Sequence, residues 1–128
     1  KTEVTNAILS RNNNLKKIIK IIHPEVRKKM NSFIKRNKNS KFVVLDIPLL
    51  LENKINKKKD IIVFIDAKKK EINKRLKKRG NINLQLIKKF KKVQLSLEFK
   101  KKKSSFIIKN NFKNYSVKKS VRYILKSI

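Results

Sequence analysis

The feature that most constrains this chain is the apolar stretch at residues 41–52, KFVVLDIPLLLE. Residues 42–47 run through Asp46 and stop at Pro48, which predicts a strand buried on both faces. Such a strand needs parallel neighbours with helices outside the sheet. Ligands of open α/β sheets bind at the carboxyl ends of the strands, so Asp46, Pro48 and Glu52 are candidate site residues. The competing interpretation is that Asp46 only caps the strand and Glu52 is a solvated loop residue.

Two further apolar segments complete the expected sheet. Residues 60–66, DIIVFID, predict a second buried strand that again ends in an acidic residue, and residues 105–109, SFIIK, predict a third, short strand. The other segments carry apolar residues at helical spacing, which predicts helices over residues 2–9, 15–22, 24–36, 68–79, 82–97 and 117–128. Strands alternating with helices indicate an α/β fold with a parallel sheet.

Three local signals set the expected helix boundaries. The residue before a proline is pushed out of the α region, so His23 and Pro24 predict a break, with a new helix that starts at Pro24. Gly80, the only glycine, predicts the C-cap of the helix over residues 68–79. The lysine run at residues 100–103 predicts a solvated loop. His23 is also the only histidine, and by itself it is more typical of a cap or packing residue than of a catalytic base.

The positive charge of the chain suggests ligands that carry phosphate, but it does not show that the ligand is a nucleic acid. Lys and Arg number 38 against 8 Asp and Glu, a formal net charge of +30. Because the excess is mostly lysine, is spread along the chain and accompanies many Ile and Asn residues, biased composition explains it better than a dedicated nucleic-acid face does. The chain has no cysteine, which excludes disulfides and thiolate chemistry and fits a reducing cytoplasm. No apolar run approaches the roughly 18 residues that a membrane span needs.

Arg75 and Arg79 are candidate phosphate ligands. They lie one helical turn apart, and guanidinium groups neutralise the charge on phosphoryl oxygens. On spacing alone a solvated basic face explains the pair better, but only six of the basic residues are arginine in a chain that otherwise uses lysine. A single glycine cannot build a glycine-rich phosphate loop, so this sequence contains none.

The order of several motifs resembles the dephospho-CoA kinase family. The shared features are HPEVR at 23–27, VVLDIPLLLE at 43–52, DIIVFIDA at 60–67, Arg75 and Arg79, Gln94, and IIKN at 107–110. The pair HP-x-x-R and PLL-x-E is the most specific part. The resemblance covers nearly all of the chain and corresponds to the later two thirds of the family's sequence. Ser105 stands where the family usually has Asp.

The resemblance implies a P-loop nucleoside/nucleotide-kinase-like fold, incomplete here because its first strand and P-loop are absent. It also implies ATP-dependent phosphorylation of the ribose 3′-hydroxyl of dephospho-CoA, the last step of coenzyme A synthesis, with Mg²⁺. Residues 1–40 would form a helical substrate-side region, and residues 41–128 the rest of the kinase core with a lid at about 75–98. The implied substrate-binding residues are His23, Arg27, Asp46, Pro48, Leu49 and Glu52. The implied ATP-binding residues are Arg75 and Arg79, which are also catalytic, with Gln94 and Asn110.

The same resemblance predicts that a segment carrying the P-loop precedes Lys1, and that its strand lies between residues 42–47 and 61–65. We therefore expect the chain alone to be unstable and inactive and a full-length version to be active. The alternatives are a basic RNA- or DNA-binding module and another nucleoside or nucleotide kinase of the same fold. On the leading interpretation the partners are dephospho-CoA and ATP, with no specific nucleic acid and no membrane, and the oligomeric state is undetermined.

Overall fold

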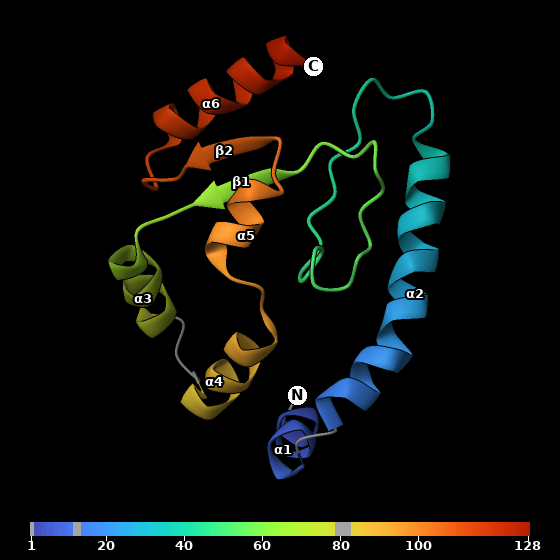
Figure 1. Cartoon of the computed structure of the whole chain (residues 1–128), viewed down its shortest axis with the longest axis vertical. Helices are drawn as coiled ribbons and strands as arrows, with labels where there is room; N and C mark the ends of the chain where they lie inside the picture. The colour runs from blue at the N-terminus through green and yellow to red at the C-terminus, as the bar shows by residue number, and fades with distance from the viewer. Residues whose placement is uncertain (1, 12–13, 79–82) are drawn as a thin grey trace. The chain divides into compact units, whose positions relative to one another are not determined.

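The computed structural model describes residues 2–11, 14–78 and 83–128 (Figure 1). The described chain is a mostly helical α/β protein with a small parallel sheet. Its elements, in order, are α1 (Thr2–Ser10), α2 (Asn14–Arg36), β1 (Val63–Asp66), α3 (Lys69–Lys78), α4 (Leu84–Val93), α5 (Leu97–Lys102), β2 (Phe106–Lys109) and α6 (Asn114–Ser127).

These elements pack as two units. The first contains Lys1–Ile55 and Leu84–Val93, and the second contains Asn56–Asn83 and Gln94–Ile128. This division describes which segments pack together. The functional division of the sequence into a substrate-side region and a kinase core with a lid stays a prediction.

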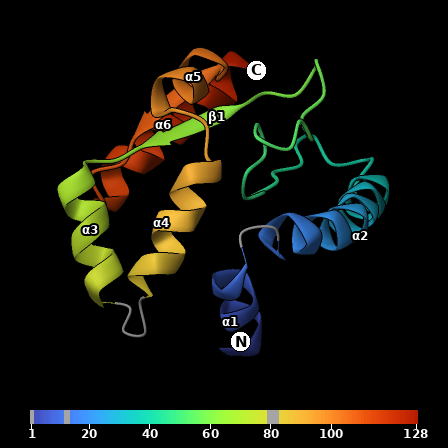
Figure 2. The same ribbon diagram turned by 60° about the horizontal axis from the view of Figure 1, so that its bottom comes forward.

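The first unit joins α1, α2 and α4, with Ile8 and Leu15 buried. The carboxyl end of α1 is fixed by side chains from the other two helices. The ammonium group of Lys89 on α4 donates to the carbonyl oxygens of Ile8 and Leu9 at 2.8 and 3.0 Å, and the Asn14 side-chain amide donates to the Ala7 carbonyl at 2.7 Å. The last carbonyls of a helix lack partners within it, so a cation placed there satisfies them and complements the helix dipole. Figure 2 shows α4 beside α1.

The predicted break at His23 and Pro24 is wrong, because α2 runs without interruption from Asn14 to Arg36 and includes Pro24. A proline inside a helix removes one backbone hydrogen bond but does not have to end the helix. The apolar spacing of α2 continues across Pro24, since Ile18 and Ile19 before it and Val26 after it are all half-buried. The helical pattern of the sequence therefore runs through the proline, and the helix follows it. The helix predicted over residues 2–9 is confirmed as α1, and residues 12 and 13 of the connection predicted after it lie outside the described residues.

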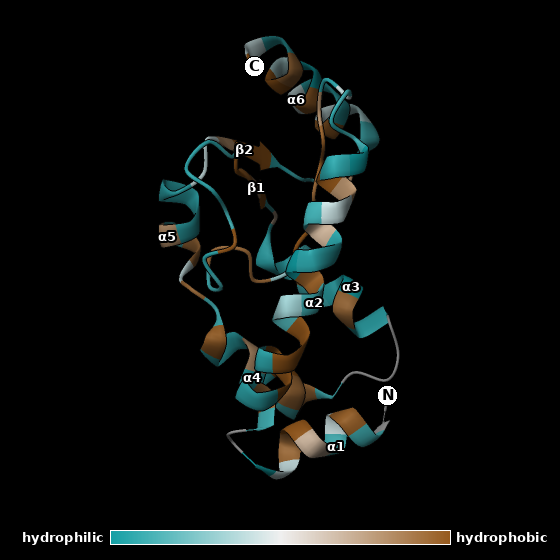
Figure 3. Cartoon of the chain, turned by 90° about the vertical axis from the view of Figure 1, so that its right-hand side faces the viewer, coloured by the Kyte–Doolittle hydropathy of each residue, from teal (hydrophilic) through white to brown (hydrophobic). Residues whose placement is uncertain are grey.

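The second unit is built on the parallel pair β1 and β2, in which Val63 is opposite Phe106 and Asp66 is opposite Lys109. The parallel pairing predicted from the sequence is therefore confirmed for these two strands. Helix α6 packs on β2, where Ile108 is 4% exposed and Ile124 of α6 is also buried. Figure 1 shows α6 running alongside β2, and Figure 3 shows the two strands as a hydrophobic ribbon.

The predicted strand at residues 42–47 is not formed, because that segment is irregular and the one sheet of the described chain contains only β1 and β2. A strand is held by ladder hydrogen bonds to a neighbour, and its apolar composition cannot replace them. Val44 is 88% exposed, and Asp46 is exposed as well. The α/β class is thus confirmed with a two-stranded sheet rather than a larger one.

Other boundaries also differ from those predicted. The lysine run at residues 100–103 is not a loop, since Lys100, Lys101 and Lys102 belong to α5. The Ser96 hydroxyl caps this helix by accepting from the Phe99 amide at 3.2 Å. The single helix expected over residues 82–97 ends at Val93, and the predicted C-cap at Gly80 lies outside the described residues.

Candidate functional site

Within the first unit, the predicted residues Pro48, Leu49 and Glu52 lie in one compact turn. Backbone hydrogen bonds close it: the Asn53 amide donates to the Leu49 carbonyl at 3.0 Å, and the Ile55 amide donates to the Leu50 carbonyl at 3.2 Å. Ile55 is buried and anchors the turn in its unit.

The backbone of Leu49 has a φ of 56° and that of Lys54 a φ of 49°. Both values lie in the left-handed region, which is unfavourable for residues with a Cβ. Strain of this kind persists only where the surroundings impose it, and it often marks a functional segment. The backbone therefore supports the interpretation of the turn as a site segment.

Helix α2 contacts the same turn through Arg27. One guanidinium nitrogen of Arg27, Nη2, donates to the Asn53 carbonyl oxygen at 3.4 Å. His23 lies one helical turn before Arg27 on α2 and is half-buried, so the two share one side of the helix. The structure thus brings Arg27 to the Pro48–Glu52 segment. Asp46 lies in the irregular segment just before it and is exposed.

In the second unit, the carboxyl end of β1 is joined to the loop that follows β2. The Asn110 amide donates to the Asp66 carbonyl oxygen at 2.7 Å. The Asp66 carboxylate accepts from the Lys101 ammonium of α5 at 2.8 Å, and both side chains are about one third exposed, at 32% and 38%. Asn110, a predicted ATP-binding residue, is therefore fixed at the carboxyl edge of the parallel strands, where ligands of such sheets bind.

Arg75 lies in the last turn of α3, and its guanidinium stacks on the Phe112 ring at 3.9 Å from the ring centroid. Phe112 belongs to the loop that Asn110 begins, since the Asn110 side-chain oxygen accepts from the Phe112 amide at 2.8 Å. Two predicted ATP-binding residues, Arg75 and Asn110, are thus brought to one loop. Gln94 is exposed in the connection between α4 and α5, and Arg79 lies outside the described residues.

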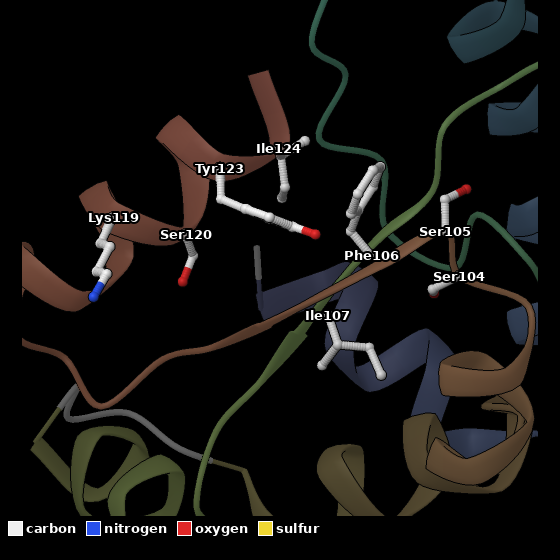
Figure 4. Close-up of a pocket in the computed structure, with 8 residues that line it drawn as sticks. All are labelled: Ser104, Ser105, Phe106, Ile107, Lys119, Ser120, Tyr123 and Ile124. Carbon is white, nitrogen blue, oxygen red and sulfur yellow. The ribbon is translucent and has the colours of Figure 1, made fainter. Parts of the chain in front are cut away.

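A shallow groove on the second unit lies apart from the predicted site residues. Its walls are β2 and α6, and Figure 4 shows Tyr123 reaching from α6 toward Phe106. None of the residues predicted from the sequence lines this groove. Its lining residues are Ser104, Ser105, Phe106, Ile107, Lys119, Ser120, Tyr123 and Ile124.

Sequence reasoning did not single out Phe112 or the ion pair between Lys101 and Asp66. Asp66 was visible as an acidic residue at a strand end, but nothing in the sequence chose Lys101 among so many lysines. The Asn pair before Phe112 predicts a turn, because Asn side chains bond to backbone amides two residues on. That signal locates the loop but does not reveal that its aromatic residue meets Arg75.

Two further observations on the described residues concern a metal site and a membrane-spanning helix. No three His, Cys, Asp or Glu side chains of the described residues gather as a metal site requires. Among the same residues, none of the helices combines the length and apolarity needed to cross a membrane.

Comparison with known proteins identifies the family. A model of the dephospho-CoA kinase family matches residues 1–115 of this chain. A dephospho-CoA kinase of Wolbachia pipientis wMel is 34% identical over 130 residues, which cover 100% of this chain and 66% of the relative. One from Bartonella henselae is 32% identical, with 98% of this chain and 66% of the relative covered. One from Fusobacterium nucleatum is 39% identical over 100 residues, 76% of this chain and 50% of the relative.

The chain spans 66% of the length of the first two relatives, just under two thirds. The family match nevertheless extends from the first residue to residue 115 and includes both the turn at Pro48 and the loop at Asn110. The resemblance predicted from the motifs is confirmed, and the chain belongs to the dephospho-CoA kinase family.

Proposed function

We propose that this chain is part of an enzyme that transfers the γ-phosphoryl group of ATP to the ribose 3′-hydroxyl of dephospho-CoA. The 3′-oxygen forms a bond to the γ-phosphorus, the bond from that phosphorus to the bridging oxygen of ADP breaks, and the hydroxyl loses its proton. The products are coenzyme A, ADP and the released proton. Membership of the family supports this reaction, and it supports a P-loop kinase fold for the whole protein.

The observation that carries the proposal is the meeting of Arg75 with the loop of Asn110. Arg75 stacks on Phe112, and Asn110 is bonded to the end of β1, so both lie by the carboxyl edge of the strands. Phosphoryl transfer needs positioned cations more than covalent chemistry, since charge spreads over the transferring oxygens. In the proposed site Arg75 and Arg79 neutralise that charge and Asn110 lies beside the adenine. Gln94, in the connection between α4 and α5, is a further proposed ATP-binding residue.

On the acceptor side we propose the turn that follows residues 42–47. Arg27 bonds to this turn, and His23 is one helical turn from Arg27. A guanidinium held by one hydrogen bond keeps other N–H groups for a phosphate of dephospho-CoA, because Arg has five donors. Asp46, Pro48, Leu49 and Glu52 border the proposed acceptor site, and the strained φ of Leu49 favours a functional role for that segment.

Mg²⁺ is a further part of the proposal, and two acidic residues of the second unit already have partners. The carboxylate of Asp66 is occupied by Lys101, and that of Asp60 accepts from the Lys57 amide at 2.7 Å. Kinases usually hold Mg²⁺ through substrate phosphates and one or two carboxylates. We therefore assign no residue of this chain to the metal. The cytoplasmic location expected from the composition likewise stays a prediction.

The test is an ADP-release assay on the full-length gene product and on the 128-residue chain, with dephospho-CoA as the acceptor. We expect turnover by the full-length protein and none by the chain alone, because its single glycine cannot form a phosphate loop. Replacing Arg75 by Met should lower kcat/KM by about 100-fold, as loss of a donor to the transferring group does. Arg122→Met is the matched control, since Arg122 is an exposed arginine of α6 outside the proposed site.

Two outcomes would refute the proposal in favour of the alternatives. Faster phosphorylation of nucleoside monophosphates than of dephospho-CoA would indicate another kinase of this fold. Sequence-specific binding of RNA or DNA that survives physiological salt, together with no ADP release, would indicate a nucleic-acid-binding module.

A further inference from the structure

Phe112 combines a strained backbone with a specific contact. Its φ is 62°, in the left-handed region, where a bulky aromatic residue is an outlier. Its ring lies under the Arg75 guanidinium at 3.9 Å, the shortest of the cation–ring contacts within the described residues. An observed backbone outlier justifies a functional hypothesis when the surroundings impose it.

The surroundings of Phe112 do impose its conformation. On one side, Asn110 bonds through its backbone amide to Asp66 at 2.7 Å and through its side-chain oxygen to the Phe112 amide at 2.8 Å. On the other side, the Asn111 side-chain oxygen accepts from the Lys113 amide at 3.0 Å and also from the Ser116 hydroxyl. The loop is therefore tied to the end of β1 and to the start of α6, and these bonds fix the backbone from which the Phe112 ring projects.

The stacking of Arg75 on Phe112 is compatible with a phosphate ligand, because it leaves the N–H donors of the guanidinium available. Stacking on a ring uses the face of the guanidinium, whereas its N–H donors lie in its plane. Arg75 can therefore rest on Phe112 and still direct several donors at phosphate oxygens. Arg75 is exposed, so without the ring its long side chain would sample many rotamers and lose more entropy on binding ATP.

We propose that Phe112 is a positioning residue for Arg75, which it holds in the orientation that binds the phosphates of ATP. The role rests on the proposed function, and it acts through Arg75 rather than on the substrate. It is confined to the ATP side, because the loop of Phe112 belongs to the unit that contains β1, β2 and α3.

The test compares Phe112→Leu, Phe112→Tyr and Phe112→Gly in the full-length gene product. Leu and Gly should raise the KM for ATP about two- to fivefold, the equivalent of an exposed cation–π contact, and leave the KM for dephospho-CoA unchanged. Tyr keeps the ring and should retain the parent KM for ATP. The matched control is Phe99→Leu, since Phe99 lies near a cation, Lys103, at 5.8 Å, but outside the proposed site.

Phe112→Gly separates positioning from structure. Glycine adopts a positive φ without a Cβ clash, so this variant should keep the parent thermal midpoint or exceed it while its KM for ATP rises. A parallel rise of both KM values with a fall of the midpoint would overturn the proposal, because it would assign Phe112 a purely structural role.

The remaining outcomes separate this inference from the proposed function. If the full-length protein releases ADP but Phe112→Leu and Phe99→Leu have the same KM for ATP, the positioning role is wrong and the kinase function stands. If Phe112→Leu binds ATP more tightly, the stack opposes ATP binding and the positioning role is again wrong. If the unsubstituted protein releases no ADP, the proposed function fails first and the positioning role falls with it.

Discussion

The urea m-value of the 128-residue chain should be low, because the chain buries little surface. Its accessible surface is 11609 Å² for a mass of 15.2 kDa. A folded monomer of that mass exposes about 7,100 Å², and two separate domains of half the mass would expose about 8,600 Å² by the same scaling. The unfolded chain would expose about 22,000 Å². The chain therefore buries about half of its unfolded surface, where a typical domain of this length buries about two thirds.

The urea m-value follows from this area. It scales with the surface exposed on unfolding, which is about 10,400 Å² here against about 14,900 Å² for the typical domain. We therefore expect an m-value about 30% below that of an average protein of this length. Apolar residues on both strands account for part of the difference, since Ile65 is 52% exposed and Ile107 is 49% exposed.

The assay is equilibrium urea unfolding of residues 1–128, followed by circular dichroism at 222 nm and by tyrosine fluorescence of Tyr115 and Tyr123. We expect a broad transition with a midpoint at low urea, and the two probes should not coincide, because the two units have separate cores. The full-length gene product is the control. A single sharp transition with an average m-value in the 128-residue chain would refute the reasoning.

Three substitutions, two of them with a comparison variant, test the second unit in the same urea titration of this chain. Ile108→Ala should destabilise the second unit by about 2–5 kcal/mol, the usual range for an aliphatic core residue. Ile107→Ala, on the opposite face of β2, should cost clearly less. Equal losses of stability would contradict the assigned faces. Ser96→Ala removes the cap of α5 and should cost about 1 kcal/mol, with Ser96→Asp restoring it. Lys101→Met breaks the partly exposed ion pair with Asp66 and should cost at most about 1 kcal/mol of stability. The loss should shrink in about 1 M salt, because salt screens exposed ion pairs. A larger loss that does not depend on salt would assign Lys101 a packing role.

The part of the fold that the sequence predicts is the part set by local patterning. The spacing of apolar residues predicted α1 and both parts of α2, and the apolar run at residues 105–109 predicted the strand β2 that precedes α6. The parallel direction of β1 and β2 also followed, because strands that alternate with helices pair in parallel. Each of these features depends on neighbours close in sequence or on a general rule of chain connection.

One error came from a feature that depends on a distant partner, and two came from local signals. Residues 42–47 have the composition of a buried strand, but strand formation needs a paired neighbour, and no described residue supplies one. A second error occurred at Pro24, where a local rule predicted a break and α2 is continuous, because a proline does not have to end a helix. The lysines after Phe99 form a helix because Ser96 caps it, although their charge alone indicates a solvated loop.

The candidate site shows the same division between local signal and distant contact. Motif order selected Arg75 and Asn110, and the structure brings both to one loop. The residue that links them, Phe112, follows two asparagines that predict only a turn. Whether a side chain in such a turn meets a helix 37 positions earlier depends on the packing of the unit, which periodicity does not encode.

Charge alone therefore cannot locate function in this chain, because lysine is nearly everywhere and a lysine-rich surface attracts any polyanion. The two arginines with contacts described above have specific partners, as do Lys89 and Lys101. Arg27 donates to a backbone carbonyl in a strained turn, and Arg75 stacks on an aromatic ring, so each guanidinium is oriented by the fold. An ammonium group is a compact point charge that cannot stack by its face while it directs several in-plane donors at a ligand. Shape, more than charge, thus distinguishes the two arginines that we propose bind substrate from the lysines that surround them.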